Sequence, residues 1–110
     1  MKTLTGQLKA ERKLLSDPKR WTKGHFARDA NGIPTDYYSK TATCWCQMGA
    51  AQKIGSNVSA TSLKQLVSGM FNYQDDVAFN DAPKTTHKDL MEFYDVCIIH
   101  AKNIDSLVTY

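Results

Sequence analysis

Apolar residues recur at intervals of three and four positions in four segments of this chain, which is the spacing of an amphipathic helix. In the first segment, residues 4–15, leucines form one side and basic residues the other. Thr3 or Thr5 is suited to cap the start of this helix, and Ser16-Asp17-Pro18 is suited to end it. Residues 41–54 are predicted as a second helix, with Ser39 or Thr41 as the cap and Gly55 at the left-handed position that follows a helix.

The third predicted helix covers residues 59–71, with Ser59 or Thr61 as its cap. Its expected apolar face consists of Leu63, Leu66, Val67, Met70 and Phe71. Residues 72–83 are expected to form a connection in which Val77 and Phe79 tuck into the core.

The fourth predicted helix, residues 86–103, is the longest, and Thr86 with Asp89 resembles a capping box at its start. Its apolar stripe makes it the expected centre of the core, and it consists of Leu90, Phe93, Tyr94, Cys97, Ala101 and Ile104. The apolar end of the chain, residues 107–110, is expected to dock onto the rest.

Residues 19–40 lack helical periodicity and contain Asn31-Gly32, a dipeptide that suits a type I′ hairpin turn. Residues 24–30 and 33–38 are the candidate arms of this hairpin, and Pro34 restricts the second arm to the edge of a sheet. An irregular loop with a single turn is the alternative. The predicted fold class is therefore mainly α, with about four helices and a small hairpin or irregular loop packed on one side.

Composition narrows the class of protein. The chain has 110 residues, of which 42% are hydrophobic and 23% charged, so we expect a single globular domain over residues 1–110. No apolar run approaches the ~18–20 residues of a membrane helix, and the N-terminus lacks a signal-peptide core, so we expect no membrane association. Three cysteines do not suggest a disulfide framework, which favours a cytoplasmic protein.

The charges are unevenly distributed along the chain. Fourteen basic and eleven acidic residues give a net charge of +3, and the basic residues concentrate before position 29. Either the basic and acidic halves pack together, or the N-terminal half presents a basic face to an acidic partner or a phosphate backbone. The residues of this basic face would be Lys9, Arg12, Lys13, Lys19, Arg20, Lys23 and Arg28.

No spacing in the sequence is typical of catalysis or of metal binding. Cys44 and Cys46 are one residue apart, whereas zinc sites space their cysteines by two to four, and on a helix the two thiols would point apart. The three histidines are far apart, and no glycine-rich nucleotide loop is present. We therefore expect no catalytic residues, no metal and no cofactor.

Three segments, in their order and spacing, resemble an uncharacterised family of bacteria and their phages, DUF6197. The segments are WTKGHFARDANG at 21–32, ATCWCQMGA at 42–50 and FNDAPKT at 79–85. The resemblance covers residues 4 to about 101 and carries no known activity. It implies that one structural or functional cluster, the motif cluster, is formed by Trp21, Asp29, Cys44, Trp45, Gly49, Asn80 and Asp81.

Three functions remain open. The favoured one is a small non-enzymatic interaction protein of bacterial or phage origin that binds a host or cellular protein. The alternatives are a small enzyme or ligand-binding domain that uses the motif cluster, and nucleic-acid binding through the basic N-terminal half. The sequence does not fix the oligomeric state.

Overall fold

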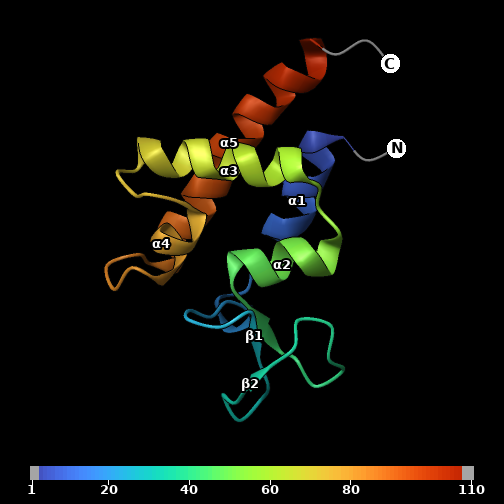
Figure 1. The fold of residues 1–110 in the computed structure, drawn as a ribbon, viewed down its shortest axis with the longest axis vertical. Helices are drawn as coiled ribbons and strands as arrows, with labels where there is room; N and C mark the ends of the chain where they lie inside the picture. Colours follow the sequence, from blue (N-terminus) through green and yellow to red (C-terminus); the bar gives the residue numbers. More distant parts are fainter. Residues whose placement is uncertain (1–2, 108–110) are drawn as a thin grey trace.

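The fold is mainly helical, with a small antiparallel sheet at one end (Figure 1). The computed structural model describes residues 3–107. The helices are α1 (Leu4–Leu14), the 3-10 helix η1 (Pro18–Arg20), α2 (Gln47–Ile54), α3 (Val58–Met70), α4 (Asp76–Asp81) and α5 (His87–Leu107). The strands are β1 (Ala27–Arg28), β2 (Pro34–Thr35) and β3 (Cys44–Trp45), in the order β2-β1-β3. The expected fold class is confirmed.

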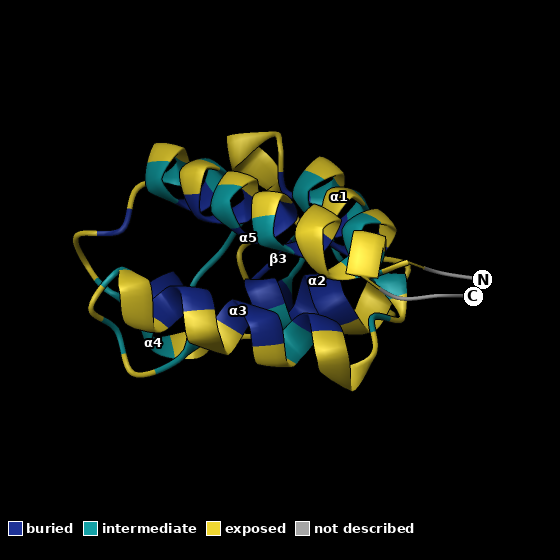
Figure 2. Ribbon diagram, turned by 90° about the horizontal axis from the view of Figure 1, so that it is seen from above, coloured by how far each residue is buried: buried dark blue, intermediate teal, exposed yellow. Residues whose placement is uncertain are grey.

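The helices form two layers whose buried faces point toward each other (Figure 2). One layer contains α1 and α5, and the other contains α2 and α3. Aromatic side chains fill the space beneath α4, where Phe79 stacks on Phe93 with ring centroids 4.7 Å apart. Phe93 is fully buried, as expected for the stripe of the last helix. Within residues 3–107, no helix combines the length and apolar character that a membrane crossing requires.

Predicted helix starts are confirmed at both ends of the fold. Thr3 caps α1 by accepting a hydrogen bond from Gly6 N at 2.9 Å. Thr86 and Asp89 form the capping box of α5, with reciprocal bonds of 3.0 and 3.1 Å. Asp105, near the end of α5, accepts from Thr5 N at 2.9 Å and so links the last turn of α5 to the first turn of α1.

The predicted helix over residues 41–54 is wrong in its first half. Residues 44–45 pair with β1 as strand β3, and α2 begins after them with Cys46 as its cap. The two hydroxyls expected to cap a helix, those of Ser39 and Thr41, instead bond to each other at 2.9 Å. The predicted end is correct, since Gly55 adopts a φ of +80°.

The hairpin forms, but its turn is not type I′. That turn requires positive φ at both central residues, and of the 29–32 segment only Gly32 has positive φ, at +78°. The turn closes through Gly32 N and Asp29 O at 3.0 Å, and the Asp29 carboxylate accepts from the backbone of Asn31 and Ile33. A side chain therefore supplies the hydrogen bonds that fix the turn. Pro34 lies on the edge strand β2, as expected.

The predicted apolar face of α3 is only half correct. Leu63 and Val67 are buried, but Leu66 and Met70 are 72% and 62% exposed. Lys64, the one charged residue of this helix, is fully buried instead. The cap is Asn57 rather than Ser59 or Thr61, so α3 begins slightly earlier than predicted.

The connection after α3 contains a helix that the periodicity did not reveal. In α4, which Asp75 caps, Phe79 is buried as expected, whereas Val77 is 42% exposed. The helix has six residues, too few to show an amphipathic repeat. At the end of α5, Ile104 is 41% exposed and Leu107 is exposed, which contradicts the docking expected there, and residues 108–110 lie outside the described residues.

Candidate functional site

The centre of the motif cluster is the side chain of Asn80. Its Oδ1 accepts from the Trp21 indole N–H at 2.7 Å and from Gln47 N, in the first turn of α2, at 3.1 Å. Its Nδ2 donates to Thr22 O at 3.2 Å and to Asp81 Oδ1 at 2.9 Å. Asn80 is buried, so one amide joins α4 to α2 and to the loop that follows η1.

Asp81 extends this junction toward the surface. Its Oδ1 also accepts from Gly24 N at 2.9 Å, which holds the loop before β1 against the end of α4. Lys23 supports the same contact by donating to the carbonyl oxygens of Ala82 and Thr85, each at 2.7 Å. The turn after α4 and the loop before β1 are therefore fixed to each other from both sides.

Gly49 is required at its position because the backbone of the loop lies directly on α2. A Cβ atom at Gly49 would lie 2.0 Å from Phe26 O and 2.8 Å from the carbonyl carbon of Phe26. The same carbonyl oxygen accepts from Cys46 N at 3.2 Å. No side chain larger than hydrogen fits between this loop and the first turn of α2.

These contacts enclose a pocket of about 240 Å³ beside the first turn of α2. Its walls come from the loop before β1, the start of α2 and the exposed side of α4. The lining residues are Gly24, His25, Phe26, Cys46, Gln47, Met48, Val77, Asn80 and Asp81. Most of this lining is apolar, and Asp81 is its one formally charged residue.

Cys46 lies in this pocket as the cap of α2. Its sulfur accepts from Gly49 N at 3.3 Å, which is the role that a serine or threonine oxygen usually fills. Burial raises the pKa of the Cys46 thiol, and the nearby Asp81 carboxylate acts in the same direction. A thiol with a raised pKa stays protonated at neutral pH, whereas the thiolate is the form that acts as a nucleophile.

The structure brings together five of the seven residues of the motif cluster. Trp45 joins through its backbone bridge to Trp21, and its indole donates to Tyr37 O at 2.9 Å. Asp29 and Cys44 take no part in these contacts, and of the seven residues only Asn80 and Asp81 line the pocket itself. Asp29 serves the hairpin turn, and the Cys44 sulfur is 3.9 Å from Arg28 O.

The seven residues of the predicted basic face occupy different environments. Arg28 bonds to Thr22, to Gly32 O and to Lys23 O, and Lys23 is held by carbonyl groups, so these two cations are directed inward. Lys19 and Arg20 are exposed on η1. The remaining three, Lys9, Arg12 and Lys13, lie on α1. Together with Lys102 and Asp95 of α5 they line a shallow groove.

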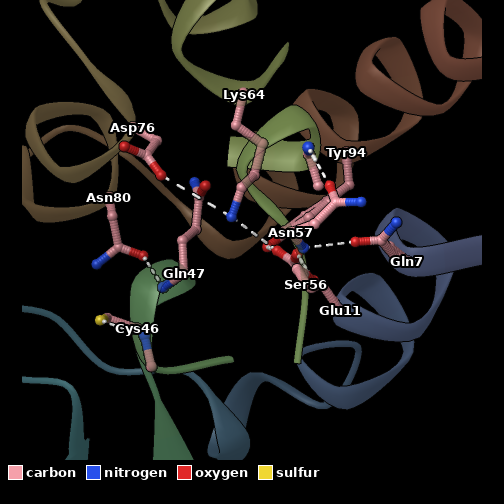
Figure 3. A network of polar contacts seen from close by, with 12 residues as sticks. Gln7, Glu11, Cys46, Gln47, Ser56, Asn57, Lys64, Asp76, Asn80 and Tyr94 are labelled. Atoms are coloured by element: carbon pink, nitrogen blue, oxygen red, sulfur yellow. Dashed lines mark hydrogen bonds and ion pairs between the residues drawn. The ribbon is translucent and has the colours of Figure 1, made fainter. Parts of the chain in front are cut away.

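A second polar cluster, the buried charge cluster, lies between the two helical layers (Figure 3). Glu11 Oε1 accepts from Lys64 Nζ and from the Tyr94 hydroxyl, both at 2.8 Å, and Glu11 Oε2 accepts from Ser56 Oγ at 2.6 Å. Asp76 Oδ2 lies 3.9 Å from Lys64 Nζ. The side chains of Glu11, Lys64 and Tyr94 are fully buried.

Sequence reasoning missed this cluster, although one signal was present. Glu11 lies three residues after Leu8 and four before Leu15, on the apolar side of α1. A charged residue on such a stripe indicates a buried partner, because an unpaired buried charge is very costly. Lys64 sits similarly between Leu63 and Val67.

Burial raises the pKa of two acidic groups of this cluster, Asp76 and Tyr94. It raises the pKa of Asp76, which the positive charge of Lys64 opposes. It also raises the pKa of Tyr94 well above its usual range, with the Glu11 charge adding to the effect. Burial raises the pKa of Cys97, next to the cluster, to about 12. Across residues 3–107, no three His, Cys, Asp or Glu side chains are grouped so as to hold a metal ion.

The chain belongs to a family of unknown function, DUF6197, whose model matches residues 1–100. This match confirms the resemblance drawn from the three motif segments. No curated protein and no solved structure shows significant similarity to the chain.

Proposed function

We propose that this protein is a small non-enzymatic interaction domain that holds one side chain of a partner protein, packed through its apolar part, in the pocket beside α2. The observation that carries this proposal is the pocket itself, which is lined mostly by apolar atoms and by residues of the three motif segments together with Val77. Its volume of about 240 Å³ is below the ~300–1,000 Å³ typical of cofactor and substrate sites. A pocket of this size suits one side chain better than a nucleotide or another large cofactor.

The rim of the pocket also favours a protein partner. Phe26 is 47% exposed and Val77 is 42% exposed, and both line the pocket. Large apolar side chains at the edge of an apolar pocket are typical of contact surfaces, where an anchor side chain enters and its surroundings exclude water.

An enzyme that uses the motif cluster is less well supported. The Cys46 thiol accepts a capping bond and has a raised pKa, and Asn80 uses both side-chain polar atoms to join elements of the fold. The Asp29 carboxylate accepts backbone hydrogen bonds within the hairpin turn. None of these groups is placed as an activated nucleophile or general base.

Cellular context forms part of the proposal. The three cysteines are free and lie at separate depths, with Cys44 half-buried and Cys46 and Cys97 buried, which suits a reducing compartment. We propose a cytoplasmic location on this ground, and a bacterial or phage origin on the ground of the family resemblance.

A pair of matched variants tests the binding role. Val77→Arg places a charge at the pocket rim, whereas Val58→Arg makes the same change at an exposed position of α3 that does not line the pocket. Proteins crosslinked to the wild-type chain in a host lysate are identified by mass spectrometry and compared with those of each variant. We expect a specific partner to be retained by Val58→Arg and lost with Val77→Arg.

Two outcomes would contradict the proposal. Equal retention of the partner by both variants would place the interface elsewhere. Binding of the purified protein to duplex DNA, with loss of affinity on Lys9→Gln and Lys13→Gln, would favour the nucleic-acid alternative.

A further inference from the structure

The pocket beside α2 has a built-in preference for one sign of charge. Asp81 is the one formally charged residue among the nine that line it. Its Oδ1 is fixed by Gly24 N and Asn80 Nδ2, both at 2.9 Å. Its second oxygen has no hydrogen-bond partner among residues 3–107, and the side chain is exposed. One carboxylate oxygen therefore remains available in a fixed position.

Among residues 3–107, no cation forms an ion pair with this carboxylate. Lys23 directly precedes Gly24, whose N–H binds Asp81, but its ammonium group donates to the carbonyl oxygens of Ala82 and Thr85. In the described part of the chain, Lys23 forms no ion pair with Asp81. The negative charge of Asp81 thus acts on whatever enters the pocket.

Free backbone N–H groups at the start of α2 could attract an anion, but two of them already have hydrogen-bond acceptors. Gln47 N donates to Asn80 Oδ1 and Gly49 N donates to the Cys46 sulfur. With these groups occupied and a carboxylate facing the same space, an anionic ligand would be repelled. A cation attached to an apolar stem is the chemistry that fits both the charge and the walls.

On the basis of the proposed function, we infer that the partner's side chain in this pocket is a lysine. Its methylene groups pack on Phe26, Met48 and Val77, and its ammonium group donates to the second oxygen of Asp81. The aromatic ring of Phe26 also favours a cation close to its face. Arginine fits less well, because its planar fork pairs best with two acceptors and Asp81 has one oxygen left.

Three blocked amino acids test this inference on the full chain by NMR titration at pH 7.5 and low salt. They are the Nα-acetyl methylamides of lysine, norleucine and Nε-acetyl-lysine, which share an apolar stem and differ in charge. We expect resonances of Phe26, Met48 and Val77 to shift, and lysine to bind about three- to tenfold more tightly than norleucine. The preference should shrink at high salt.

Asp81→Asn is the decisive variant, because it keeps the Oδ1 acceptor for Gly24 and Asn80 while removing the charge. It should bind lysine and norleucine equally, whereas the control Asp95→Asn, on α5 away from the pocket, should keep the preference for lysine. Equal binding by the wild type, or a preference that survives Asp81→Asn, would overturn the lysine assignment and leave the proposed function standing. No shift of pocket resonances by any of the three compounds would refute both.

Discussion

The indole N–H of Trp21 donates to Asn80 Oδ1 at 2.7 Å, although 59 residues separate the two in the sequence. The same oxygen accepts from the backbone of Gln47, so one acceptor serves two donors from different elements. The amide nitrogen of Asn80 bonds in the opposite direction, to Thr22 O and to Asp81. This arrangement requires an amide, because neither a carboxylate nor an alcohol offers the same acceptor and donors in one plane.

Asn80→Ala should therefore destabilise the protein strongly. It leaves the buried Gln47 N–H without a partner, at about 1–3 kcal/mol, and the partly buried Trp21 indole without one at a smaller cost. Urea unfolding followed by circular dichroism measures this loss, and Asn103→Ala, at an exposed position of α5, serves as the control with an effect within about 0.5 kcal/mol.

Asn80→Asp should be less damaging at acid pH than at pH 7, where two carboxylates would face each other. Wild-type stability in Asn80→Ala would show that this junction does not hold the fold.

Two glycines in helices should respond oppositely to the same substitution. Gly49→Ala places a Cβ atom 2.0 Å from Phe26 O, so backbone must move, at a cost of about 1–3 kcal/mol or more. At Gly69 a Cβ atom would meet nothing within 4 Å, so Gly69→Ala should stabilise the protein by about 0.5–1 kcal/mol. Thermal melts of the two variants provide the comparison, and two changes of the same sign would contradict the close contact between α2 and the loop.

The sequence predicted the fold best where local signals and burial agree. The capping box of Thr86 and Asp89 and the stripe beneath Phe93 located α5 because capping and periodicity are local properties. Strand β3 was misassigned because Cys44 and Trp45 pair with residues some 16–18 positions earlier, and such pairing leaves no helical or alternating pattern in two residues.

The faces of α3 were assigned by hydrophobicity, and tertiary contacts overrode that rule. Lys64 turns inward because Glu11, 53 residues earlier, supplies a buried acceptor, and this rotation leaves Leu66 in solvent. The motif segments did identify the residues around the pocket. They grouped Asp29 with the others, although a position just before Asn31-Gly32 is one where an Asp commonly fixes a turn, as Asp29 does.

Removing the charge of Glu11 should be among the most damaging conservative changes. Glu11→Gln leaves the fully buried Lys64 without its close negative charge, and an uncompensated buried charge typically costs about 3–5 kcal/mol. Glu92→Gln, an exposed partner of Lys88 on α5, is the matched control and should change the free energy of unfolding by less than about 0.5 kcal/mol. Similar midpoints in urea for the two variants would show that the buried pair contributes little.

Asp76 should make stability increase as the pH falls from neutral. Burial raises its pKa in the folded state, so the folded protein holds a proton that the unfolded chain has already released. Proton binding then favours the folded state as the pH falls through the raised pKa, and the gain levels off below the ordinary value near 3.8. Asp76→Asn removes this dependence. Urea unfolding of both proteins should show the free energy of unfolding of the wild type rising relative to that of the variant between pH 7 and pH 4. Parallel dependence of the two free energies on pH would rule the effect out.

The three thiols should react with a maleimide in order of exposure. Cys44 is half-buried and should react first, Cys46 should react slowly, and Cys97, whose pKa is about 12, should react only after unfolding. Mass spectrometry of timed samples gives the order. Rapid labelling of Cys46 in the native protein would reopen the case for a nucleophilic role.

The contacts of α1 also constrain when this chain folds during its synthesis. Glu11 is made 83 residues before Tyr94, and Thr5 is made 100 residues before Asp105, whose carboxylate binds its backbone. Until α5 is translated, α1 lacks both the Tyr94 hydroxyl and the Asp105 carboxylate, although Lys64 is already present. Assembly of the helical layers therefore follows the translation of α5, and a nascent chain that stalls before Tyr94 lacks the helix against which α1 packs and one of the hydrogen bonds to Glu11.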